Sequence, residues 1–295
     1  MRTSIFKGTG VALVTPFKNS LEIDYPALEN IVNHVITNGI DFLVALGTTS
    51  EAVVLTEDEK TRVVQTIVKA NNGRVPVMMG VGGNNTAAIL RQLKQQKIAG
   101  IKGVLSVVPY YNKPQQDGIK THFLAIADVS PVPVILYNVP GRTAQNMTAK
   151  TCLELAKHPN IVAVKEASGD LQQIMTIIKD KPADFSVLSG DDALTMPLIA
   201  LGADGVISVS ANAFTRDFSE MVRLQRAGET LQARVLHYKI LEMMNLLFED
   251  GNPAGVKALL NLMGLCEDVL RLPLVAMRSD LKQQMKQLLA QNQIY

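Results

Sequence analysis

The chain has 295 residues, of which 47% are hydrophobic and 19% charged, and its formal net charge is +2. This size fits one large domain with a substantial core. The small net charge, without a basic stripe or zinc-finger spacing, excludes the usual pattern of a nucleic-acid-binding protein. No uninterrupted apolar run approaches the ~20 residues that span a bilayer.

The two cysteines, Cys152 and Cys266, lie far apart and outside any metal-type cluster. The N-terminus lacks the apolar core of a signal peptide. We therefore expect a cytoplasmic protein with reduced thiols and no metal site.

Short apolar runs recur along the first three-quarters of the chain. They are rich in Val, Ile and Leu and lack polar alternation, which is typical of parallel strands covered on both faces. The predicted strands are Gly10–Val14, Asp41–Leu46, Val75–Gly80, Gly103–Val108, Val132–Tyr137, Ile161–Lys165, Phe185–Ser189 and Gly205–Val209.

Helical patterns fill the intervals between these strands. One helix is expected to begin after Thr56, because three acidic residues follow it. Others are predicted over Tyr25–Asn38, Asn85–Gln96, Asp117–Ala127, Thr148–His158, Leu171–Lys179 and Ala193–Leu201. Repeated β–α units predict an α/β fold, a (β/α)8 TIM barrel. The alternative is a doubly wound open sheet, but Gly80–Asn85 does not fit its glycine-rich loop and follows the third strand, not the first.

After about Phe218 the strand pattern ends and only helical patterns follow, with breaks near Gly251–Pro253, Gly264 and Pro273. We place the barrel at residues 1–217. Residues 218–295 are predicted to hold the last barrel helix and a C-terminal helical extension.

Polar residues follow the carboxyl ends of several predicted strands, where the active sites of TIM barrels lie. Lys165 ends an otherwise apolar run, so its stem is expected to point into the barrel. Burial disfavours the charged ammonium, and a neutral amine can attack a ketone to form an imine. The alternative is a lysine paired with Glu166 or another acid at the strand end.

Other side chains at the same mouth have both functional and structural interpretations. Tyr137 can relay protons or serve as a core tyrosine, and Thr48 and Thr49 can bind a carboxylate or belong to a capping loop. Arg142 can recognise a carboxylate or form a surface ion pair. Tyr110 and Tyr111 are paired aromatics at the mouth and poor core candidates. Gly190-Asp191-Asp192 is read as a turn and helix cap, and the four histidines as surface or packing residues.

Six motifs in order resemble the dihydrodipicolinate synthase / N-acetylneuraminate lyase family of pyruvate-dependent class I aldolases. They are GTTSE (47–51), PYYNKP (109–114), YNVPGRT (137–143), VKEASGD (164–170), SGDDA (189–193) and GVISVSAN (205–212). The resemblance continues to NPAGVKALL (252–260) and covers nearly the whole chain.

The resemblance implies a catalytic centre in which Lys165 forms a Schiff base with pyruvate and needs no separate cofactor. Tyr137, Thr49 and Tyr111 would form a proton relay, with Tyr111 donated across a tight dimer interface in a homotetramer. Thr48 and Thr49 would hold the pyruvate carboxylate, and Gly190 and Ile207 would supply backbone contacts.

The presence of Arg142 helps to distinguish between members of this family that act on different second substrates. The resemblance implies that it receives the carboxylate of aspartate-β-semialdehyde, in a condensation that gives 4-hydroxy-tetrahydrodipicolinate at the first committed step of the diaminopimelate and lysine pathway. Several lyases of the family lack this arginine, and an aldolase or lyase acting on a sugar acid such as N-acetylneuraminate is the alternative. A barrel kept only for ligand sensing is a third interpretation, but it would be expected to lose the lysine or the tyrosines.

One departure from the family concerns feedback by lysine. Asn84 and Tyr110 match the family's effector site, whereas Ala52, Val53, Glu57, Lys60 and Ala88 replace its histidines, small polar residues and glutamate. We therefore predict weak or absent inhibition by lysine.

Overall fold

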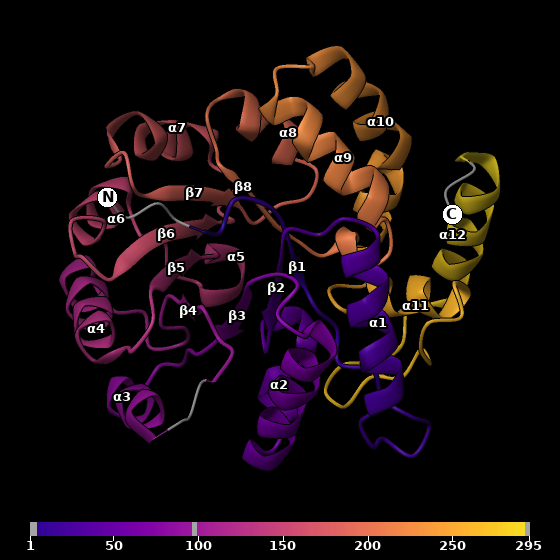
Figure 1. The fold of residues 1–295 in the computed structure, drawn as a ribbon, viewed down its shortest axis with the longest axis horizontal. Helices are drawn as coiled ribbons and strands as arrows, with labels where there is room; N and C mark the ends of the chain where they lie inside the picture. The colour runs from indigo at the N-terminus through magenta and orange to yellow at the C-terminus, as the bar shows by residue number, and fades with distance from the viewer. Residues whose placement is uncertain (1–4, 96–98, 293–295) are drawn as a thin grey trace.

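Eight parallel strands form a closed barrel, as the sequence predicts (Figure 1). The computed structural model describes residues 5–95 and 99–292. The strands are β1 (Gly8–Ala12), β2 (Phe42–Ala45), β3 (Val77–Gly80), β4 (Gly103–Val107), β5 (Val134–Asn138), β6 (Ile161–Glu166), β7 (Ser186–Ser189) and β8 (Gly205–Ser208). Each pairs with its neighbours in sequence order, and β8 closes the barrel on β1.

Helices surround the barrel and cover the outer faces of its strands (Figure 1). They are α1 (Tyr25–Thr37), α2 (Glu57–Asn71), α3 (Thr86–Gln95), α4 (Gln116–Val129), α6 (Ala149–Leu155), α7 (Leu171–Asp180), α8 (Thr195–Ala200) and α9 (Thr215–Arg226). The predicted start of α2 is confirmed: Thr56 and Glu59 form a reciprocal capping box, which stabilises a helix by about 1 kcal/mol. The predicted helix end at Gln96 lies outside the described residues.

The core has two parts that follow from the two faces of each strand. The barrel interior is filled by a small cluster that includes Phe6, Phe42, Met78, Tyr137 and Ile207. A much larger cluster lies between the outer strand faces and the helices. Because both faces are buried, the strands read as continuous apolar runs.

Short elements at the carboxyl ends of the strands were not predicted. The β2–α2 connection contains two 3-10 turns, η1 (Thr48–Ser50) and η2 (Ala52–Val54), while α5 (Pro140–Thr143) follows β5 and η3 (Ser210–Asn212) follows β8. Such short segments carry no usable hydrophobic period.

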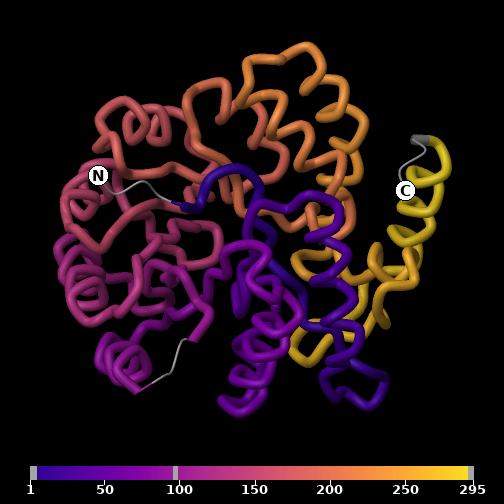
Figure 2. The backbone as a smooth tube through the Cα atoms, viewed as in Figure 1, coloured from indigo at the N-terminus to yellow at the C-terminus, as the bar shows by residue number. Residues whose placement is uncertain are grey.

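The C-terminal segment continues as α10 (Thr230–Leu246), α11 (Ala254–Leu262) and α12 (Ser279–Asn292). Figure 2 shows that it runs from the orange α10 back along the side of the barrel where the indigo α1 lies. The boundary placed between residues 217 and 218 falls within α9 and stays a prediction. Among the described residues, no helix is both long enough and apolar enough to cross a membrane.

Candidate active site

Lys165 lies near the carboxyl end of β6, and its side chain points into the barrel. It is 6% exposed and pairs with Tyr137 of β5 in the strand register. Its Nζ lies 4.4 Å from the centroid of the Tyr137 ring. An amine on an aromatic face inside an apolar barrel is poorly hydrated, which is the environment expected for an imine-forming lysine.

The ion pair with Glu166, the structural alternative for Lys165, does not form. Glu166 faces the opposite side of β6, where its carboxylate accepts hydrogen bonds from Asn138 Nδ2 at 3.1 Å and from the Ser168 amide at 2.8 Å. Burial raises the pKa of the Glu166 carboxyl, against the opposing effect of these donors. Within residues 5–95 and 99–292, Lys165 has no carboxylate partner.

Gly190 lies close to Lys165, and Ile207 belongs to the barrel interior. A Cβ atom on Gly190 would lie 3.1 Å from Lys165 Cε and 2.6 Å from Ala167 Cβ. Only glycine leaves space for the lysine side chain to pass this point. Ile207 is 1% exposed and belongs to the same interior cluster as Tyr137.

A cavity of about 560 Å³ opens at the carboxyl ends of the strands, and Tyr137 forms part of its wall. Tyr137 therefore joins the cavity to Lys165. Three more predicted residues line the cavity: Thr48, Tyr110 and Arg142. Arg142 is exposed and forms no ion pair in the described part of the chain, so its guanidinium is available to an anion.

The two threonines of the β2–α2 connection have different environments. Thr48 is exposed and lines the cavity. Thr49 is 2% exposed, and its Oγ1 accepts a hydrogen bond of 3.0 Å from Asn252 Nδ2. A ligand in the cavity therefore reaches the Thr48 hydroxyl more directly than the Thr49 hydroxyl.

Tyr111 is placed away from the other predicted catalytic residues of its own chain. Its side chain is 87% exposed, it is not among the residues that line the cavity, and its backbone φ is 74°. Positive φ is uncommon for an aromatic residue and is frequent at functional sites. Next to it, Asn84 Nδ2 donates to the Tyr110 carbonyl at 3.2 Å.

Three of the residues that replace the family's effector groups line the same cavity. Ala52, Val53 and Lys60 line the cavity together with Tyr110. Lys60 Nζ lies 2.7 Å from Glu57 Oε1. This wall therefore presents an apolar surface beside a cation.

The residues interpreted as structural have structural roles here. Asp191 Oδ1 accepts from the Leu194 amide at 3.1 Å, as expected of a turn before a helix. Asp192 is buried and accepts from the Ser210 amide and hydroxyl, so it ties the β7 and β8 loops together. His122 packs in the core, where burial lowers its pKa to about 4.

Three residues near the site were not predicted to act there: Glu51, Asn252 and Lys257. Asn252 contacts Thr49, and Glu51 forms a buried ion pair with Lys257 of α11. A lysine inside the apolar run AGVKALLNL was a signal of a buried cation. Its partner lies 206 residues away, and no local pattern identifies it.

Comparisons with known proteins point to one family. The family model described as the dihydrodipicolinate synthetase family matches residues 5–292. A 4-hydroxy-tetrahydrodipicolinate synthase from Parabacteroides distasonis is 52% identical over 286 residues, which cover 97% of this chain and 96% of that protein.

Two solved structures have the same fold over nearly the full length. A dihydrodipicolinate synthase from Acinetobacter baumannii in complex with pyruvate has a TM-score of 0.95 at 38% identity, covering 98% of this chain and 99% of that one. The enzyme from Cyanidioschyzon merolae with lysine bound has a TM-score of 0.94 at 39% identity, covering 99% of both chains. The chain belongs to the dihydrodipicolinate synthetase family.

Proposed function

We propose that this protein condenses pyruvate with aspartate-β-semialdehyde to give 4-hydroxy-tetrahydrodipicolinate, at the first committed step of the diaminopimelate and lysine pathway. The observation that carries the proposal is the buried Lys165. It has no carboxylate partner among the residues that the structure describes, and it lies over Tyr137 beside a cavity with an arginine in its wall. The name of the Parabacteroides relative supports this reaction.

In this mechanism Lys165 forms the covalent intermediates with pyruvate. Its neutral amine attacks the ketone carbon of pyruvate, and loss of water leaves a protonated imine. The imine withdraws electrons, so the methyl carbon loses a proton and becomes an enamine nucleophile that attacks the aldehyde carbon of the second substrate. The amino group of that substrate then displaces Lys165 as the ring closes, so the cycle needs no separate cofactor.

Proton transfers fall to the hydroxyl groups around the imine. Tyr137 is adjacent to Lys165 and open to the cavity, which supports it as the nearest proton carrier. The exposure of Thr48 favours it for direct contact with substrate, with Thr49 behind it. Gly190 and Ile207 are assigned backbone contacts with the three-carbon unit.

Arg142 is proposed to bind the carboxylate of aspartate-β-semialdehyde through its planar guanidinium. Its position in the cavity wall, with no acidic partner among the described residues, supports this role. A sugar-acid lyase would instead need hydrogen-bonding groups for several substrate hydroxyls. The apolar wall formed by Val107 and Val139 disfavours that alternative.

The assembly is proposed to be a homotetramer of tight dimers, in which Tyr111 completes the partner's site. The exposed, positive-φ conformation of Tyr111 supports this exchange, because strained backbone conformations are frequent at functional sites. Exposed apolar side chains on α7, at the end of α8 and on α10 are candidates for the contact between dimers. They are Leu171, Met175, Leu201, Leu231, Val235 and Tyr238.

Borohydride reduction in the presence of pyruvate tests the mechanism. Mass spectrometry should find the reduced adduct on Lys165, and a coupled assay should show turnover with pyruvate and aspartate-β-semialdehyde. An adduct on another residue would refute the role of Lys165. Cleavage of N-acetylneuraminate faster than the condensation would decide for the lyase.

A further inference from the structure

The loop that carries both threonines has a backbone conformation that it does not favour by itself. Glu51 joins η1 to η2 in the left-handed region, with φ 55° and ψ 33°. A non-glycine residue in this region costs free energy and persists only when the surroundings hold it. The contacts of Glu51 identify those surroundings.

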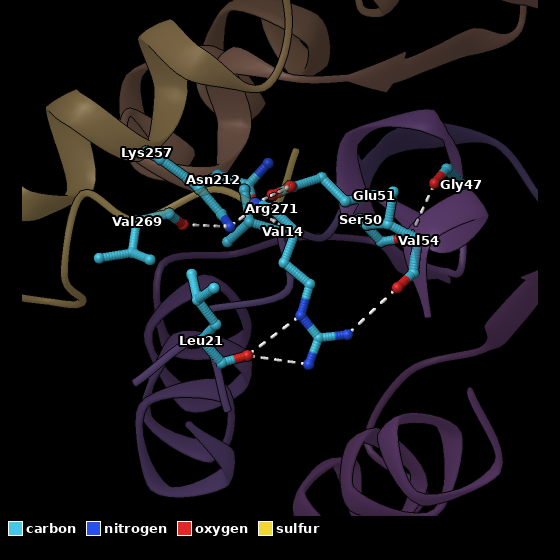
Figure 3. A network of polar contacts seen from close by, with 10 residues as sticks. All are labelled: Val14, Leu21, Gly47, Ser50, Glu51, Val54, Asn212, Lys257, Val269 and Arg271. Carbon is cyan, nitrogen blue, oxygen red and sulfur yellow. Dashed lines mark hydrogen bonds and ion pairs between the residues drawn. The ribbon is translucent and has the colours of Figure 1, made fainter. Parts of the chain in front are cut away.

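The Glu51 side chain is fully buried, and both carboxylate oxygens have partners in the C-terminal segment (Figure 3). Oε1 accepts from Lys257 Nζ at 2.5 Å, and Oε2 accepts from the Arg271 backbone amide at 3.1 Å. A buried carboxylate needs such partners, because an unpaired one is strongly disfavoured. The extension therefore fixes the position of Glu51.

Lys257 is itself held from several directions. It is 0% exposed, donates to the Val269 carbonyl at 2.8 Å and lies with Nζ 4.1 Å from the centroid of the Phe17 ring. Burial lowers the pKa of Lys257, while the Glu51 carboxylate acts in the opposite direction. The position of the Lys257 ammonium is thus fixed by its own helix α11, by the Val269 carbonyl and by Phe17 of the β1–α1 connection.

Two more contacts tie the same loop to the extension. Asn252 Nδ2 donates directly to Thr49 Oγ1. Arg271 donates to the carbonyl of Val54, the last residue of η2, at 3.1 Å and to the Leu21 carbonyl at 2.8 Å (Figure 3). The loop is therefore held at Thr49, Glu51 and Val54 by residues that lie outside the barrel strands.

We propose that Lys257, acting through Glu51 and together with Asn252, is a positioning residue that holds the Thr48 hydroxyl toward the substrate and the Thr49 hydroxyl directly behind it. The inference rests on the proposed function, because it assigns those hydroxyls to the pyruvate carboxylate and the imine. Precise placement of such groups contributes strongly to rate, and a misplacement of about 1 Å can cost about 100-fold. The extension would then be part of the catalytic apparatus without touching substrate.

The test compares Lys257→Met with Lys239→Met. Lys239 forms an ion pair of 2.8 Å with Asp217 between α10 and α9 and does not contact the loop. Both variants lose one ion pair outside the barrel strands. We expect Lys257→Met to lower kcat by about 10- to 100-fold and to raise the pyruvate KM, whereas Lys239→Met keeps both constants.

Borohydride trapping of pyruvate counts the competent sites and separates positioning from partial unfolding. Unfolding alone reduces the number of trapped sites and kcat together and leaves KM unchanged. Asn252→Ala provides a second variant if Lys257→Met does not fold, and it should raise the pyruvate KM in the same direction.

The proposal would be overturned if folded Lys257→Met kept the wild-type kcat per trapped site and the wild-type KM. If only Asn252→Ala folds, the same result in that variant would overturn it. That failure is distinct from failure of the proposed function, in which the wild-type protein itself shows neither turnover nor an adduct on Lys165.

Discussion

Lys165 and Lys257 are both buried, and each holds its Nζ above an aromatic ring, at 4.4 Å from the Tyr137 centroid and 4.1 Å from the Phe17 centroid. Their other neighbours differ. Lys257 has the Glu51 carboxylate and the Val269 carbonyl as partners, whereas Lys165 has no carboxylate partner in the described part of the chain and lies beside a cavity wall. Burial alone therefore does not distinguish a reactive lysine from a structural one; the presence of a hydrogen-bonding partner does.

The largest expected effect comes from Lys165→Met. Turnover should fall by roughly 10³-fold or more, because the variant has no amine to form the imine. The free energy of unfolding should stay within about 1 kcal/mol of wild type or rise, since a buried amine without an ionic partner is replaced by an apolar group. Coupled assays and urea denaturation check both parts. A loss of several kcal/mol would show that Lys165 also has a structural role.

In contrast to Lys165→Met, Lys257→Met should lower the free energy of unfolding. It leaves the Glu51 carboxylate buried without its cation, which costs about 4 kcal/mol. Urea denaturation measures the loss. The double variant Glu51→Leu with Lys257→Met removes both charges and should recover part of the stability. No recovery in the double variant would mean that the ion pair is not the origin of the loss.

Gly190→Ala tests how closely the site surrounds Lys165. The added Cβ meets Lys165 Cε and Ala167 Cβ at less than normal contact distance, so we expect a loss of about 1–3 kcal/mol and a reduced rate of imine trapping. Gly83→Ala is the control, because its Cβ would make only an ordinary contact of 3.8 Å with Ile89. Equal trapping rates in the two variants would contradict the described position of the lysine.

A smaller effect is expected where Arg271 meets Glu59. Two hydrogen-bonding contacts of 2.8 and 2.6 Å lower the pKa of Glu59 from 4.5 to about 2. The folded state therefore gains stability from this pair above pH 4.5 and loses it as the pH falls toward 2. A double-mutant cycle of Glu59→Gln and Arg271→Met should give a coupling of about 1 kcal/mol at pH 7, because the pair is partly exposed. A coupling that does not shrink at low pH would refute the ionic origin.

The smallest expected effect is that of free lysine on turnover. The wall formed by Ala52, Val53 and Lys60 offers no carboxylate to an incoming ammonium, and Ala88 stands where the family has a glutamate, so millimolar L-lysine should inhibit weakly or not at all. Initial rates with and without lysine measure this. The Cyanidioschyzon relative binds lysine, and strong inhibition here would show that the substitutions leave such a site intact.

The sequence predicts the barrel because the features that define it are local. Each apolar run becomes a strand, and the amphipathic intervals become helices, so the positions of the eight strands along the chain follow from periodicity. The end of a strand is also local, which is why Lys165 and Tyr137 are found together in register. The sequence motifs also identify the family, which the comparisons confirm.

Tertiary structure alone decided three further points. It exposes Thr48 and buries Thr49, although the two are adjacent and chemically identical. It gives Tyr111 a positive φ in an exposed position. It also joins Glu51 to Lys257 across 206 residues. Such contacts depend on how distant elements pack in three dimensions, and a local hydrophobic period carries no information about that packing.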